Sequence, residues 1–132
     1  MSHQFYEVVH IIGLVLLFSA LGGAAVRALM TGSGVPAATG SGANPRRLLG
    51  VLHGLGAFLI LLGGFGMLAR MGIMEGRGLR FPGWLWVKLA VWALLVAALM
   101  VVRRRPHVAR PLLWSLPVLG GLAAYMVIYK PF

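Results

Sequence analysis

The sequence predicts an all-α integral membrane protein folded as one antiparallel four-helix bundle. Of its 132 residues, 60% are hydrophobic and only 11% are charged, whereas soluble domains carry about 25% charged residues. Apolar runs at 6–29, 48–69, 82–102 and 112–129 are each about 18 to 24 residues long, enough to cross a hydrocarbon core of about 30 Å as helices. What remains is too short for a soluble domain, so we expect a single transmembrane domain over residues 1–132.

Each span has its own signals. The first contains a stretch, SALGGAA, that resembles a signal-peptide cleavage region. However, the N-terminal region of this span has no Lys or Arg and contains Glu7, unlike a signal peptide, so we expect the span to be retained as a helix. The second follows an uncharged loop at 30–45 that is rich in Gly, Ala and Ser. The third begins at Pro82, which suits a first helical turn. The fourth follows the tight basic connection RRRPHVARP, and short connections favour antiparallel neighbours.

Basic residues are distributed unevenly between the two ends of the spans. We call the end that holds the N-terminus side A and the other end side B. Side B carries seven basic residues, namely Arg27, Arg46, Arg47, Arg103, Arg104, Arg105 and Arg110. Side A carries four, namely Arg70, Arg77, Arg80 and Lys130, together with both glutamates. The positive-inside rule then predicts that side B is cytoplasmic and that both termini are periplasmic in a bacterial inner membrane.

The composition excludes several kinds of chemistry. The net charge of +10 is assigned to topology and lipid headgroup contacts, so no nucleic acid partner is expected. Arg27, near side B, is expected to meet lipid phosphate. The chain has no cysteine, which rules out disulfides and thiolate metal sites. Glu7 and Glu75 are its only acidic residues, so paired-carboxylate catalysis is not expected.

Four polar residues inside or near the spans are the candidates for function: Glu7, His10, His53 and Lys88. Polar groups at membrane depth are costly and usually face a bundle interior or a cavity. His10 lies about 10 Å toward side A from the centre of its span, and Lys88 about 6 Å toward the same side. Glu7 is one turn from His10 on the same helix face. These three residues are therefore expected to form one polar cluster.

His53 is expected to lie elsewhere. Its depth differs from that of His10 by about twelve residues of helical rise, about 18 Å, so the two histidines are not expected to share a metal or haem. It sits in GVLHG, 50–54, whose small-xxx-small spacing predicts a close helix contact, continued by Ala57 and Gly64. A structural hydrogen bond is the favoured role for His53.

Simpler readings compete for the other candidates. Lys88 can snorkel to the side A interface, Glu7 can lie among headgroups, and His10 can be an interhelical hydrogen-bonding residue. Trp84, Trp86 and Trp114 are assigned to the aromatic belt.

The stretch GWLWVKLAVWALLVA, from Gly83, resembles the WLHxKLxLxxLL helix of the HemJ-type protoporphyrinogen oxidases. VVHIIGLVLLFSALGGAAVRAL resembles that family's first helix, and RRLLG the start of its second. The resemblance implies a b-type haem, with His10 as iron ligand and Lys88 as its partner. Catalytic roles for both residues follow from the same resemblance. Trp86 stands where the family has a histidine, and His53 is outside the family pattern.

Two functional classes fit these observations. The first is a HemJ-like protein of redox or porphyrin chemistry, an oxidase if it is an enzyme, in which Lys88 binds a tetrapyrrole carboxylate and Glu7 orients His10. The second is a non-catalytic accessory subunit of a larger membrane complex. Either class would lie in the lipid bilayer, with other membrane subunits or a second copy of the chain as expected partners.

Overall fold

The computed structural model describes residues 2–32, 44–70 and 82–129, and these segments are helical almost throughout. Four long helices follow one another: α1 (His3–Gly32), α2 (Pro45–Arg70), α3 (Gly83–Arg104) and α4 (Ala109–Tyr129), with a single 3-10 turn, η1 (Pro106–Val108), before α4. The described segments contain no strand. All four helices are long and apolar enough to cross a membrane. The prediction of an all-α, four-helix membrane protein is confirmed.

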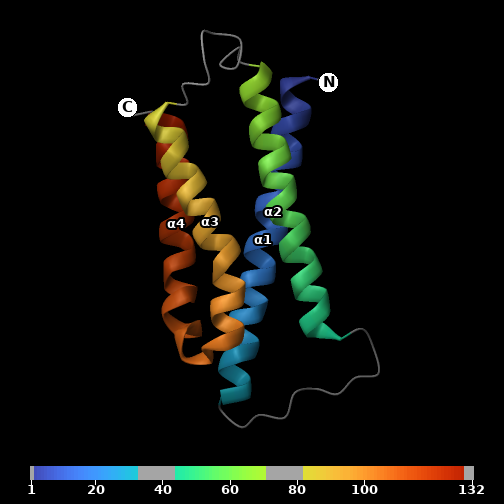
Figure 1. Ribbon diagram of the computed structural model, residues 1–132, viewed down its shortest axis with the longest axis vertical. Coiled ribbons are helices and arrows are strands. Elements are labelled where there is room, and N and C mark those ends of the chain that lie inside the picture. The colour runs from blue at the N-terminus through green and yellow to red at the C-terminus, as the bar shows by residue number, and fades with distance from the viewer. Residues whose placement is uncertain (1, 33–43, 71–81, 130–132) are drawn as a thin grey trace.

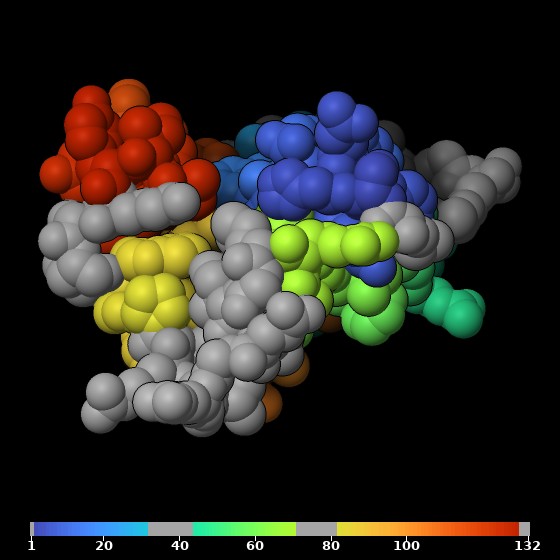
Figure 2. Space-filling model, turned by 90° about the horizontal axis from the view of Figure 1, so that it is seen from above, coloured from blue at the N-terminus to red at the C-terminus, as the bar shows by residue number. Residues whose placement is uncertain are grey.

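Successive helices run in opposite directions, so that the start of α1 and the end of α4 lie at the same end of the molecule (Figure 1). The view from side A shows α1 and α2 together on one side and α3 and α4 on the other (Figure 2). Each helix has apolar residues around its whole circumference, as expected where both lipid and protein interior are apolar. The bundle is therefore two helix pairs joined through a shared apolar core.

The closest helix contact is that of α1 with α2, and glycines make it possible. A Cβ atom on Gly56 would lie 2.7 Å from the backbone nitrogen of Leu17 and 2.8 Å from the carbonyl oxygen of Gly13. A Cβ on Gly63 would lie 2.6 Å from the carbonyl oxygen of Tyr6. Only a residue without a side chain permits backbones to approach so closely.

The predicted contact face of α2 was therefore wrong in part. A Cβ atom added to Gly54 of the GVLHG stretch would have no neighbouring atom within 4 Å. Gly50 faces the Arg103 side chain instead of a helix backbone. The contact with α1 runs through Gly56 and Gly63, seven residues apart and so on one face of the helix. A single pair of small residues four apart did not identify this face.

The central core lies at mid-bundle and draws on every helix. Its buried members are Leu17, Leu21, Ala57, Ile60, Val91, Leu95, Leu99 and Leu116. The outer face of α4 is different, since Trp114 is 77% exposed and Val118 is 69% exposed. In a soluble protein so much exposed apolar surface would be a liability, but here lipid covers it.

Candidate functional site

A cavity of about 300 Å³ lies between α1, α2 and α3 toward side A, with Val127 of α4 also in its wall. We call it the His10 cavity. Its polar and aromatic walls include His3, Glu7 and His10 from α1 and Trp84, Lys88 and Trp92 from α3. Ile60 and Gly64 are part of its α2 wall. The structure thus brings Glu7, His10 and Lys88 to one cavity, at the end of the bundle where the depth argument places them.

His10 is held against α2 by a hydrogen bond over a long sequence separation. Its Nδ1 lies 2.7 Å from the carbonyl oxygen of Ile60. Because a carbonyl oxygen only accepts, Nδ1 carries the proton and donates it. Gly63 permits this approach, because a Cβ on Gly63 would lie 2.7 Å from the His10 Cβ. A Cβ on Gly64 would lie 3.6 Å from the imidazole ring, an ordinary van der Waals contact.

This hydrogen bond determines what the other ring nitrogen offers. With the proton on Nδ1, the Nε2 atom of a neutral imidazole carries the free lone pair. Nε2 makes no hydrogen bond to any residue in the described segments. His10 is therefore an interhelical hydrogen-bonding residue, as the simpler reading expected, and also retains one unused basic nitrogen. The orienting role expected for Glu7 is filled by the Ile60 carbonyl.

Lys88 is half-buried and lines the cavity from α3. Its Nζ lies 5.9 Å from the centroid of the Trp84 ring, within the range of a cation–π contact. Glu7 is exposed, and no ion pair joins it to Lys88 within residues 2–32, 44–70 and 82–129. The expected cluster is present as a shared cavity, although Glu7 and Lys88 do not form an ion pair within it.

Two tryptophans belong to this site, although the sequence pointed to them poorly. Trp84 was assigned to the aromatic belt, yet only 9% of it is exposed. Trp92 donates its indole N–H to the carbonyl oxygen of Ala57 at 3.2 Å, so it ties α3 to α2. Trp84, Lys88 and Trp92 are spaced four residues apart and share one helix face. In the sequence, this spacing was the feature that could have indicated that both tryptophans lie beside Lys88.

His53 lies away from the cavity and is 5% exposed. Its Nε2 donates to the carbonyl oxygen of Val96 at 3.1 Å, which agrees with the structural hydrogen bond predicted for it. Its Nδ1 is buried without a hydrogen-bond partner. On α2, His53 precedes Ile60 by seven residues, about 10 Å of rise. The structure therefore keeps the two histidines apart, and no group of three or more metal-ligating side chains occurs in the segments it describes.

No protein-family model, no curated protein and no solved structure matches the chain.

Proposed function

We propose that the protein binds a b-type haem or a closely related tetrapyrrole in the His10 cavity and acts in redox or porphyrin chemistry within the membrane. The HemJ-like motifs of the sequence suggest this class. The observation that carries the proposal is the hydrogen bond from His10 Nδ1 to the Ile60 carbonyl oxygen, 2.7 Å long.

Metal-binding histidines almost always donate their second ring N–H to a carbonyl or carboxylate, which fixes the tautomer and makes the free nitrogen more basic. His10 has this arrangement through its bond to the Ile60 carbonyl oxygen. The protein's own backbone thus leaves Nε2 as the nitrogen that would hold a metal. An ordinary interhelical histidine has no need of a cavity beside it, whereas His10 lines one of about 300 Å³, at the lower end of the usual size of ligand sites.

The remaining walls fit an amphiphilic ring with carboxylate substituents. Lys88 supplies a cation for a carboxylate in surroundings that screen charge poorly, and its Nζ lies over the Trp84 ring. Trp92 is anchored by its bond to Ala57, and aromatic rings suit the faces of a flat conjugated ligand. Apolar side chains such as Leu61, Phe65 and Leu89 complete the cavity.

Iron in a porphyrin supplies one-electron redox chemistry, with a potential that depends on the axial ligand and on hydrogen bonds to it. In the proposed site His10 binds and orients, and the Ile60 carbonyl holds the proton on Nδ1. Lys88 positions the carboxylate end of the ligand, and the apolar walls exclude water.

The test is an absorption spectrum of the purified protein in detergent, titrated with haemin and then reduced with dithionite. We expect a Soret band with sharp α and β bands for the parent protein. His10→Ala is expected to abolish them or weaken binding by about a hundredfold, as for a lost metal ligand or its orienting partner. His107→Ala is the matched control, because His107 is exposed in η1 and outside the cavity.

Two further arms separate the alternatives. His53→Ala is expected to leave the haem spectrum nearly intact while lowering thermal stability, because it removes a buried hydrogen bond. Equal loss of haem in the His10 and His53 variants would contradict the assignment of the ligand. A featureless spectrum of the parent protein at every haemin concentration would reject haem binding and favour the accessory-subunit class.

A further inference from the structure

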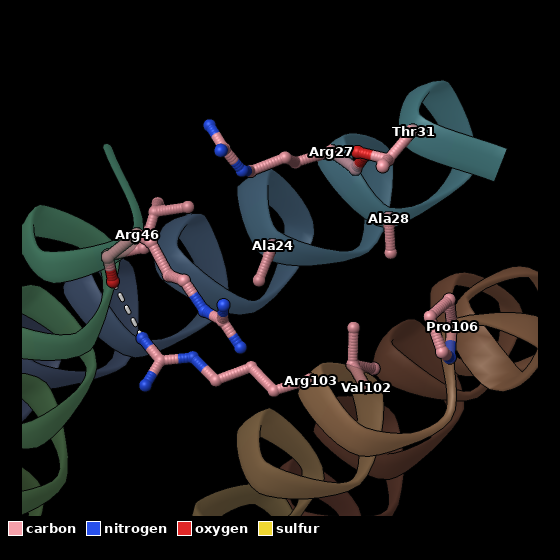
Figure 3. Close-up of a pocket in the computed structure, with 9 residues that line it drawn as sticks. Ala24, Arg27, Ala28, Thr31, Arg46, Val102, Arg103 and Pro106 are labelled. Atoms are coloured by element: carbon pink, nitrogen blue, oxygen red, sulfur yellow. Dashed lines mark hydrogen bonds between the residues drawn. The ribbon is translucent and has the colours of Figure 1, made fainter. Parts of the chain in front are cut away.

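Side B, the opposite end of the bundle, holds a second pocket with a different character. Arg27 of α1, Arg46 of α2 and Arg103 of α3 surround a cavity of about 330 Å³ (Figure 3). We call it the arginine pocket. Its remaining walls are mostly small or apolar, and include Ala24, Ala28, Leu49 and Val102. Three arginines from three helices therefore line one partly apolar pocket.

The guanidinium group of Arg103 is held in place. It donates one hydrogen bond to the carbonyl oxygen of Arg46, with a distance of 2.7 Å from Nη2. Gly50 leaves the space for it, because a Cβ on Gly50 would lie 2.8 Å from the same Nη2 atom. Since a guanidinium carries five N–H donors, this contact uses one and leaves four. The donors that remain belong to a group whose position is already determined.

The positive charge of the pocket has no counterion within the described chain. Figure 3 shows the Arg46 side chain extending from α2 toward that of Arg103, and both line the same pocket. The only acidic residue in the described segments is Glu7. It precedes Arg27 by twenty residues of α1, about 30 Å of helix, and lies in the other cavity. Adjacent like charges with no acidic partner are unfavourable unless an anion lies between them.

We propose that the arginine pocket binds the phosphate group of an anionic phospholipid headgroup. Arginine forks match phosphate oxygens and bind them through paired, charge-assisted hydrogen bonds. Basic pockets between transmembrane helices at one membrane surface are suited to lipid headgroups. The pocket also lies near the ends of α1 and α3. Lipid headgroups lie at this depth, whereas they do not reach the middle of the membrane.

A soluble phosphate compound would offer the same anion, but the walls favour the lipid. Ala24, Ala28 and Val102 give the pocket an apolar lining that a small hydrated anion does not use. The glycerol and upper acyl chain of a phospholipid do use it, since burying apolar surface stabilises binding. Lipid and soluble phosphate are therefore distinguished by whether acyl chains are needed.

The experiment measures the thermal midpoint of the protein in mild detergent as lipid is added. The three probes are phosphatidylglycerol, phosphatidylcholine and inorganic phosphate at constant ionic strength. We expect a saturable rise with phosphatidylglycerol and no comparable rise with the other two. The double variant Arg46→Gln/Arg103→Gln is expected to weaken the apparent affinity for phosphatidylglycerol by about tenfold or more.

The chain offers a matched control in Arg104→Gln/Arg105→Gln. It removes the same net charge from two exposed neighbours outside the pocket and is expected to change the affinity less than twofold. Gly50→Ala keeps every charge but intrudes on the Arg103 guanidinium, and so it tests the pocket even if the double variant does not fold. It is expected to weaken phosphatidylglycerol binding as well.

Any of four results would overturn the proposal. Equal losses in the two double variants, or no loss in Gly50→Ala, would mean that diffuse surface charge attracts the lipid. An equal rise with phosphatidylcholine would remove the need for net negative charge. If inorganic phosphate raised the thermal midpoint to the same saturating value and displaced phosphatidylglycerol, the pocket would be assigned to a soluble anion. None of these outcomes bears on haem binding, which is measured by absorption at the other end of the bundle.

Discussion

Lys88 is a cation within an otherwise apolar helix, and its surroundings define what it can do. It lines the His10 cavity, its Nζ lies over the Trp84 ring, and it lacks a carboxylate partner among the described residues. A lysine at membrane depth costs about 2.5–3.5 kcal/mol on insertion scales, although snorkelling reduces this. Within the described residues no carboxylate offsets this cost for Lys88. A ligand carboxylate is the partner that would make its position favourable.

Replacing Lys88 tests this directly. Lys88→Met removes the charge at similar length, and we expect the thermal midpoint of the ligand-free protein to stay level or rise, because no buried acid is left unpaired. The same variant is expected to lower haem affinity by about tenfold or more, the worth of a charge-assisted hydrogen bond. Lys88→Arg retains the charge and is expected to stay within a few-fold of the parent. Parent-like haem affinity in the Met variant would reduce Lys88 to an interfacial anchor.

At the scale of elements, the α1–α2 pair is specified by which glycines face the partner helix. Gly56 meets the backbone of Leu17 and Gly13, whereas nothing lies within 4 Å of a Cβ placed on Gly54. Both are glycines in the same helix, so neither residue type nor the average composition of the helix distinguishes them. The α1–α2 contact also matters for the site, because the Gly63 approach lets His10 reach the Ile60 carbonyl.

This difference predicts opposite effects of the same substitution. Gly56→Ala is expected to destabilise the bundle by about 1–3 kcal/mol, since the added methyl group meets backbone atoms that cannot rotate away. Gly54→Ala is expected to be neutral or stabilising by about 0.5–1 kcal/mol, because alanine is the better helix former. Denaturant unfolding in micelles, followed by circular dichroism, measures both. Equal effects at the two positions would contradict the packing of α1 on α2.

At the scale of the whole molecule, the protein has two unlike ends. The side A end holds the His10 cavity with its histidine and lysine, and the side B end holds the arginine pocket. Between them lies an apolar core. If side B faces the cytoplasm, as the arginine distribution predicts, the His10 cavity lies in the periplasmic leaflet and the arginine pocket in the cytoplasmic leaflet.

The absence of cysteine from the sequence makes this topology testable with single introduced thiols. Ser2 and His107 are exposed at opposite ends of the bundle. In spheroplasts, Ser2→Cys is expected to react with a membrane-impermeant maleimide, and His107→Cys is expected to react only after lysis. The parent protein serves as the unlabelled control. The reverse pattern would invert the topology and exchange the leaflets of the two pockets.

The sequence by itself determined the features that depend on position along a helix. Apolar run length predicts four spans because a helix rises by a constant amount per residue against a membrane of roughly constant thickness. The same arithmetic placed His10 and Lys88 at one depth and His53 at another, and the structure agrees. Helix bounds differ by only a few residues, and mainly because the helices continue beyond their apolar runs into polar ends.

Only the tertiary structure decided which way each helix faces. In these helices apolar residues surround the axis, and lipid is as apolar as the core, so no hydrophobic pattern distinguishes the packed face from the outer one. For that reason the sequence did not single out Gly56 over Gly54, the burial of Trp84, or the carbonyl of Ile60 as the acceptor for His10. It also gave no sign that Arg46 and Arg103, far apart in the chain, meet at one pocket. Those pairings arise from side-chain contacts between helices, which exist only once the bundle has formed.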